Sequence, residues 1–386
     1  MKSAGEALEH LAKDASENGV TKVCVEIADW AKEGHTPELA ALARGLEAAA
    51  TSAQADAYEK VVDLVEDQLA LTQSDAAIDA ILALSDEPRT KSVVVPRTTH
   101  ARQCAFASRL GYAQTKQAFV AALERHAGKH RDLFACWMHE LVLRRVSLAK
   151  EPVAQTLAEE LANTGHRLGG LPLELRPLER EAPSYMPLYG DRGLTGVLEA
   201  LAGGPMSART MPPPAEGKDV QITEKEPNPL LVSAVKPWQH GKRGKVEMKA
   251  FELSVPLSGN LLGSWLLRSL PLESTKGVAR EGLECKRVPP ESVFGPLFAA
   301  AANGGAYSSG IGGAYGRREA WTTLGALVGA PDGSGVGVIE QAAQRTVFLA
   351  FGAEGPWFYD VAWDLGVLAL HEDQRNVVVL AATDAE

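Results

Sequence analysis

Apolar residues recur at helical spacing through most of the first 165 residues. The segment from Val61 to Leu69, where apolar side chains lie three and four positions apart, is one example. Helix starts are marked by a capping box at Ser3–Glu6 and by Thr36 followed by proline. The pattern predicts an all-α domain over residues 1–165, built from helices of about 12 to 20 residues with short turns.

Two arrangements fit these helices. Antiparallel neighbours with short turns can stack in pairs, as in HEAT or armadillo repeats. The same helices can also form a compact, irregular bundle. The sequence has no strict internal period that separates the two, so both stay open.

The segment 166–230 differs in composition from the helical part. Residues 168–193 are rich in proline and leucine, which predicts an ordered but irregular strap, because apolar residues are too frequent for disorder. Residues 203–229 combine glycine, proline and charge, which predicts a flexible linker. This segment therefore separates the helical domain from a second domain over residues 231–386.

The second domain mixes strand and helix patterns. Strands are predicted over 245–255, 345–351 and 376–386, and helices over 261–272, 289–305, 317–330, 337–344 and 356–370. A helix over 356–370 between two strands implies that those strands are parallel neighbours. The predicted fold class is thus a helix-rich α+β protein, with the N-terminal helices followed by a smaller α/β or α+β domain.

Net charge and cysteine usage restrict the partners and the compartment. The formal charge of −10 argues against sequence-independent nucleic-acid binding and gives no attraction to anionic lipid. The N-terminus lacks a signal-peptide core, and no apolar run approaches the ~20 residues that span a bilayer. The four cysteines are scattered, which is typical of buried thiols in a reducing compartment. We therefore expect a cytoplasmic protein that binds neither nucleic acid nor membrane.

The most unusual stretch is NGGAYSSGIGGAYGRREAW, residues 303–321, where six glycines precede a helix pattern that opens with two arginines. Glycines permit close backbone approach, a helix N-terminus offers amides, and arginines add charge, so the stretch can hold a phosphate or carboxylate. The candidate ligand-binding residues are Ser308, Ser309, Gly312, Gly313, Tyr315, Arg317 and Arg318. The stretch 303–321 matches no known phosphate-loop motif. The favoured interpretation is that the glycines only let two elements pack closely.

Two further clusters of polar residues are weaker candidates for a functional site. His126, His130, Cys136 and His139 have zinc-ligand types, but Gly128 interrupts the spacing and Cys136 lies among large apolar residues, so we predict no metal site. Asp360 and Asp364 are four apart on the predicted helix 356–370, where solvated carboxylates are more common than an acid–base pair. No cofactor is expected from the sequence.

The chain resembles a group of uncharacterised actinobacterial proteins. The resemblance lies in a GGAY–GAYG–AW block within 303–321, a WFxxxAWDxG block from Trp357 and a terminal LAATD. It implies a bacterial, intracellular protein. It implies no activity, cofactor or functional residue.

Two functions follow from these patterns. The first is a non-enzymatic interaction or regulatory protein, of adaptor or toxin-neutralising type, that presents an acidic helical surface to a protein partner. The alternative is an enzyme or sensor that binds an anionic small molecule at residues 303–318.

Overall fold

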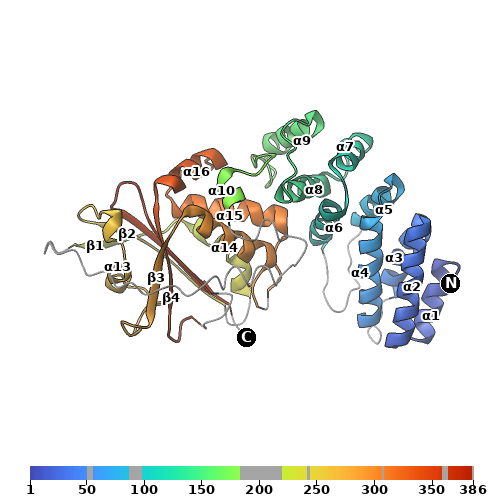
Figure 1. Ribbon diagram of the computed structural model, residues 1–386, viewed down its shortest axis with the longest axis horizontal. Coiled ribbons are helices and arrows are strands. Elements are labelled where there is room, and N and C mark those ends of the chain that lie inside the picture. The colour runs from blue at the N-terminus through green and yellow to red at the C-terminus, as the bar shows by residue number, and fades with distance from the viewer. Residues whose placement is uncertain are drawn as a thin grey trace. The chain divides into compact units, whose positions relative to one another are not determined.

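The computed structural model describes residues 1–49, 55–86, 98–182, 220–240, 244–306, 308–358 and 364–384. The chain divides into two compact units, Met1–Thr164 and Gly165–Glu386. The first unit is helical, and the second contains a sheet with helices packed against it (Figure 1). The prediction of a helix-rich α+β fold is confirmed.

The described part of the first unit consists of α-helices and their turns. The helices are α1 (Ala4–Lys13), α2 (Glu17–Glu33), α3 (Thr36–Ala49), α4 (Ala55–Leu71), α5 (Asp75–Ser85), α6 (Thr99–Ala113), α7 (Lys116–Arg125), α8 (Arg131–Leu143) and α9 (Pro152–Asn163).

Side-chain caps fix where several of these helices begin. The Ser3 hydroxyl accepts a hydrogen bond from the Glu6 amide at 3.3 Å, and Ser74 and Thr115 cap α5 and α7 in the same way. Each cap satisfies one of the first amides, which have no partner inside the helix. Gly34 ends α2 with a φ of 75°, a conformation that glycine adopts without strain.

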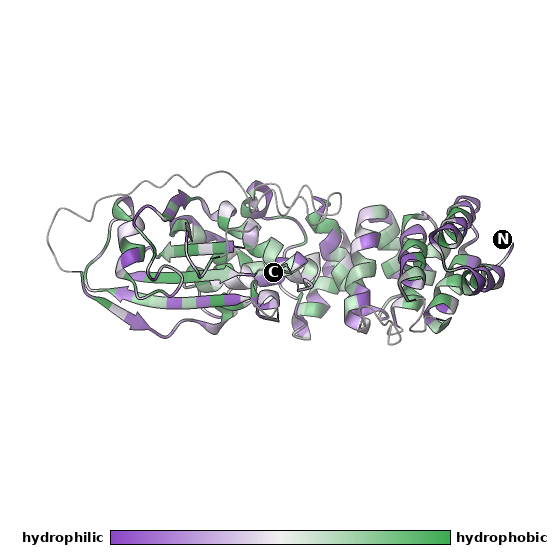
Figure 2. Cartoon of the chain, turned by 90° about the horizontal axis from the view of Figure 1, so that it is seen from below, coloured by the Kyte–Doolittle hydropathy of each residue, from purple (hydrophilic) through white to green (hydrophobic). Residues whose placement is uncertain are grey.

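The helices of this unit pack in a regular order. From α1 to α7, each helix contacts the helix two positions further along the chain. Stacked helix pairs have this order of contacts. Figure 2 shows that the N-terminal helices carry hydrophilic and hydrophobic residues on different faces, as stacking requires.

The second unit is built around a six-stranded sheet with the order β1-β2-β6-β5-β4-β3, in which every neighbouring pair is antiparallel. Its strands are β1 (Ile222–Lys225), β2 (Lys245–Leu253), β3 (Leu283–Val288), β4 (Val347–Ala353), β5 (Asp364–Leu370) and β6 (Asn376–Thr383). Its helices are α10 (Pro177–Glu181), α13 (Ser264–Ser269), α14 (Pro290–Asn303), α15 (Gly313–Leu327) and α16 (Val336–Arg345), with short 3₁₀ turns η1 (Pro229–Val232), η2 (Lys236–His240) and η3 (Gly259–Leu261).

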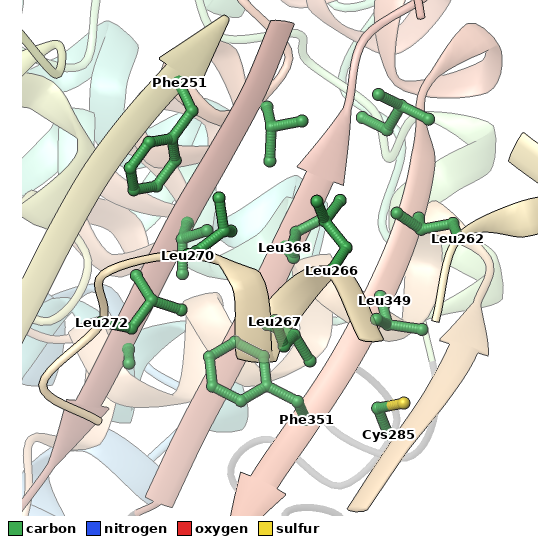
Figure 3. Packing of buried hydrophobic residues seen from close by; sticks show 14 of the residues in the cluster. Phe251, Leu262, Leu266, Leu267, Leu270, Leu272, Cys285, Leu349, Phe351 and Leu368 are labelled. Carbon is green, nitrogen blue, oxygen red and sulfur yellow. The ribbon is translucent and has the colours of Figure 1, made fainter. Parts of the chain in front are cut away.

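One face of the sheet is covered by α13 and the loop after it. Leu266 and Leu267 of α13 pack toward the sheet residues Leu368 and Phe351, and all four are 2% exposed or less (Figure 3). Complete burial of one such side chain stabilises the fold by about 1.5–3 kcal/mol. Helices α14 and α15 contact β4 and β6 respectively, so the central strands are buried on both faces.

Three sequence predictions are wrong for this unit. Residues 364–370 of the predicted helix 356–370 form strand β5, and residues 359–363 lie outside the described residues. The predicted strands 345–351 and 376–386 correspond to β4 and β6, which are not neighbours, because β5 lies between them and pairs antiparallel with both. Strand β1 and η1 occupy the end of the predicted linker 203–229, whose residues 203–219 lie outside the described ranges.

Candidate functional site

The glycine-rich segment closes the C-terminal end of α14. The amides of Gly310, Ile311 and Gly312 donate to the carbonyls of Asn303, Ala301 and Ala302 at 2.9–3.1 Å. These are carbonyls of the last turn of a helix, which have no partner inside it. Three amides of the segment, including that of the predicted ligand residue Gly312, are thus used to satisfy α14.

The glycines also allow close approach between backbones. A Cβ on Gly310 would lie 2.2 Å from the Ala302 carbonyl oxygen, and a Cβ on Gly316 would lie 2.8 Å from the Ala302 Cα. Both distances are too short for any side chain. These contacts support the interpretation that the glycines let α14 and α15 pack closely.

Arg317 is the fifth residue of α15 and is completely buried. Its Nε donates to Glu179 Oε1 at 2.6 Å and its Nη2 to Glu179 Oε2 at 2.9 Å, while the carbonyls of Pro172 and Glu174 accept from Nη1 and Nη2. The Trp321 indole donates to the same Glu179 carboxylate at 2.9 Å. The charge of Arg317 is therefore balanced by a carboxylate of α10, inside the second unit.

The other predicted site residues make contacts within the segment and with its neighbours. Ser308 accepts from the Gly305 amide at 2.9 Å, and Ser309 pairs with Gly304 as an isolated bridge. Tyr315 is buried beneath the guanidinium of Arg167, 5.0 Å from the ring centre. Gly312 and Gly313 begin α15, and Arg318 donates to Glu319. Tyr307, inside this segment, is not among the described residues.

The carboxylate of Asp384 lies against the same segment. Asp384 follows β6 and is completely buried, and within the described ranges neither of its oxygens has a hydrogen-bond partner. A Cβ on Gly305 would lie 2.0 Å from Oδ2 of Asp384. A buried carboxylate without a partner destabilises the fold and also disfavours an anion beside Gly305.

Replacement of Asp384 by asparagine is expected to raise the free energy of unfolding by about 1–3 kcal/mol, because it removes a buried charge for which the described residues provide no hydrogen-bond partner, and keeps the shape. Urea unfolding of the full chain measures this change. Asp364→Asn is the matched control. Its carboxylate accepts from the Thr383 hydroxyl, so that variant should be destabilised. A less stable Asp384→Asn protein would contradict the prediction.

Among the described residues, the remaining candidates from the sequence are not brought together. His126 and His130 bind separate carboxylates, Asp79 at 2.8 Å and Asp86 at 3.2 Å. No three His, Cys, Asp or Glu side chains gather for a metal ion within the described part of the chain. Asp364 lies on a strand rather than on a helix, and Asp360 is outside the described residues.

The first unit contains a hollow that the sequence did not reveal. It has a volume of about 390 Å³ and lies at the turns α4–α5 and α6–α7. Its lining residues are Gln73, Ser74, Asp75, Ile78, Gln114, Thr115 and Ala118. The buried Gln114 amide donates to the carbonyls of Ala70 and Thr72, which holds the two turns together.

Exposed apolar side chains flank this hollow. Leu71 at the end of α4 is 47% exposed and Tyr112 near the end of α6 is 56% exposed. Each lies two residues before a lining residue, so its Cα is within about 7 Å of the Cα of a residue that lines the hollow. Sequence periodicity gave no signal that either side chain is exposed.

Carboxylates outnumber the arginines that pair with them near the hollow. Arg109 of α6 meets Asp63, Glu66 and Asp67 of α4. Arg125 of α7 meets Asp75 and Asp79 of α5 at 2.9 and 3.2 Å. Since each arginine faces two or three carboxylates, the surroundings of the hollow stay negative.

Comparison with known proteins gives one match. The model described as "Family of unknown function (DUF6183)" matches residues 21–386. No curated protein and no solved structure matches the chain significantly. None of the helices in the described ranges combines the length and the apolar character that a bilayer span requires.

Proposed function

The chain belongs to DUF6183, a family of unknown function, and we propose that it is a non-enzymatic interaction protein whose helical unit binds a protein partner. The observation that carries the proposal is the hollow between the α4–α5 and α6–α7 turns, with Leu71 and Tyr112 exposed beside it. Apolar side chains beside a concave, partly polar surface are typical of protein-binding sites. In this proposal the protein acts in the cytoplasm, where its four free cysteines stay reduced.

The charge around the hollow indicates the chemistry of the partner. Helices α4 and α5 with their connecting turn, residues 55–86, hold eight acidic residues and one basic residue, and the arginines of α6 and α7 offset only part of this charge. A segment that places an apolar side chain in the hollow and a lysine or arginine beside it fits this surface. Complementary charge mainly raises the association rate and selects against acidic partners.

The alternative function, an enzyme or sensor for an anionic small molecule at residues 303–318, has less support. Arg317 is occupied by Glu179, and the amides of Gly310, Ile311 and Gly312 are bonded to α14. Asp384 adds a negative charge beside Gly305. An anion would have to displace contacts inside the protein. A partner at the hollow of the helical unit would instead contact side chains that are already exposed, Leu71 and Tyr112.

The proposal is tested by panning a displayed peptide library against the purified full chain. We expect enrichment of short peptides with an apolar residue next to lysine or arginine, and binding that weakens at higher salt. The double variant Leu71→Ser, Tyr112→Ser should lose at least tenfold in affinity for these peptides, because it removes both apolar contacts.

Val25→Ser is the matched control for this experiment. Val25 is as exposed as Tyr112, at 56%, and lies on α2 of the same unit. The Val25→Ser variant should bind the enriched peptides with the same affinity as the unchanged chain. Enrichment of no peptide, or equal loss in the control and the double variant, would refute the proposed binding surface.

A further inference from the structure

Two cysteines that are distant in the sequence face each other in the helical unit. Sγ of Cys104 on α6 lies 3.9 Å from Sγ of Cys136 on α8, although 32 positions separate them. Helices α6 and α8 pack directly against each other. A disulfide needs the sulfurs at about 2.05 Å, so side-chain rotation or a shift of the helices must bring them closer before the bond forms.

The two thiols differ in access and in acidity. Cys104 is partly exposed, whereas Cys136 is 1% exposed. The hydrogen bond from Cys136 and, to a smaller extent, His100, whose Nε2 lies 3.9 Å from Sγ, together lower the pKa of Cys104 to about 6, although burial opposes them. The same hydrogen bond and burial raise the pKa of Cys136. The negative charge of Glu140 on α8 disfavours the Cys104 thiolate and so raises the pKa of Cys104. Arg144 pairs with Glu140 at 2.6 Å.

We propose that Cys104 and Cys136 are a peroxide-sensitive thiol pair that forms an intramolecular disulfide across α6 and α8. Cys104 is the attacking sulfur, because it is the accessible one and lies beside His100. Cys136 is the resolving sulfur. This site is independent of the proposed partner surface.

The reaction consumes one hydroperoxide. The Cys104 thiolate attacks an oxygen of the peroxide, so that an S–O bond forms as the O–O bond breaks and the leaving oxygen departs, protonated, as water or an alcohol. Sulfur loses two electrons and the peroxide gains them. Cys136 then attacks the sulfenic sulfur, the S–S bond forms, and the S–O bond breaks with release of water that carries the Cys136 proton.

Cys24 provides a comparison within the same unit. It is also partly exposed, but burial raises its pKa and no thiol partner is recorded for it among the described residues. At pH 7, Cys104 should react with iodoacetamide about tenfold faster than Cys24, since its larger thiolate fraction outweighs its weaker nucleophilicity. As the pH is raised above 7, the alkylation rate of Cys104 should level off, while the alkylation rate of Cys24 keeps rising.

The test treats the reduced full chain with one equivalent of hydrogen peroxide. Intact mass spectrometry should show a loss of about 2 Da per chain, and peptide mapping should find Cys104 linked to Cys136. The disulfide should raise the unfolding temperature of the helical unit by about 5 °C or more. Cys136→Ser should instead trap a sulfenic acid at Cys104 that dimedone labels.

Cys285→Ser is the control variant, and it should oxidise as the unchanged chain does. The proposal is overturned if one equivalent of peroxide leaves both cysteines free, or if it links chains to one another instead. It is also overturned if Cys104 is alkylated no faster than Cys24. The peroxide titration and the comparison of alkylation rates use the unchanged chain, so these two measurements do not depend on the folding of any variant.

Discussion

Replacement of Glu179 by glutamine is expected to cost about 3–5 kcal/mol of unfolding free energy. Glu179 is completely buried and accepts hydrogen bonds from Arg317, from the Trp321 indole and from the Arg176 amide. Glutamine leaves the arginine charge buried without a counter-charge, and removal of one partner of a buried pair is far more costly than removal of both. Urea unfolding, followed by tryptophan fluorescence, measures the loss.

Glu174→Gln is the matched control for this variant. Glu174 is on the same strap, but its side chain is half exposed and lies 3.9 Å from Arg180. An exposed pair of this kind contributes little, so the control should change stability by less than about 1 kcal/mol. The double variant Glu179→Leu, Arg317→Met should lose less than the sum of the single losses. Equal losses in Glu179→Gln and Glu174→Gln would show that the buried pair has no special role.

The second large effect concerns Gly316 on α15. An alanine there is expected to destabilise the fold by about 1–3 kcal/mol, because its Cβ would lie within 2.7–2.9 Å of atoms of Ala302 on α14. In a helix open to solvent, the same change stabilises by up to about 1 kcal/mol. The sign of the effect therefore reports whether the two helices are in close contact.

Gly337 on α16 is the matched control, since a Cβ there would meet no atom within 4 Å. Gly337→Ala should stabilise by a few tenths to about 1 kcal/mol. Thermal unfolding of the two variants side by side is sufficient. A stabilised Gly316→Ala protein would mean that α14 and α15 lie further apart than described.

Local signals in the sequence account for most of the helices. Ser3, Ser74 and Thr115 cap the helices that follow them, and Gly34 ends one, because caps and left-handed glycines depend on neighbouring residues only. Strand β5 was predicted as a helix for a physical reason. It is buried on both faces, so its apolar residues are continuous, and periodicity does not distinguish such a strand from a buried helix.

The candidate sites depend on contacts that no sequence pattern encodes. The glycine-rich segment was visible, but whether its amides face an anion or the carbonyls of α14 is decided by tertiary packing. In the sequence, Arg317 is a candidate ligand for an anion. Its partner Glu179 lies 138 positions away, so no local pattern indicates that the two residues pair. The Cys104–Cys136 contact joins α6 to α8 across the whole of α7.

The distribution of charge in the helical unit has a consequence for synthesis. Residues 1–86 carry 17 acidic and 6 basic side chains, while Arg102, Arg109 and Arg125, which pair with them, lie on α6 and α7. As the chain leaves the ribosome, α1–α5 emerge before these counter-charges and repel one another. Stable packing of the first five helices must therefore wait for the arginines, so a protein cut after α5 should stay soluble but poorly folded.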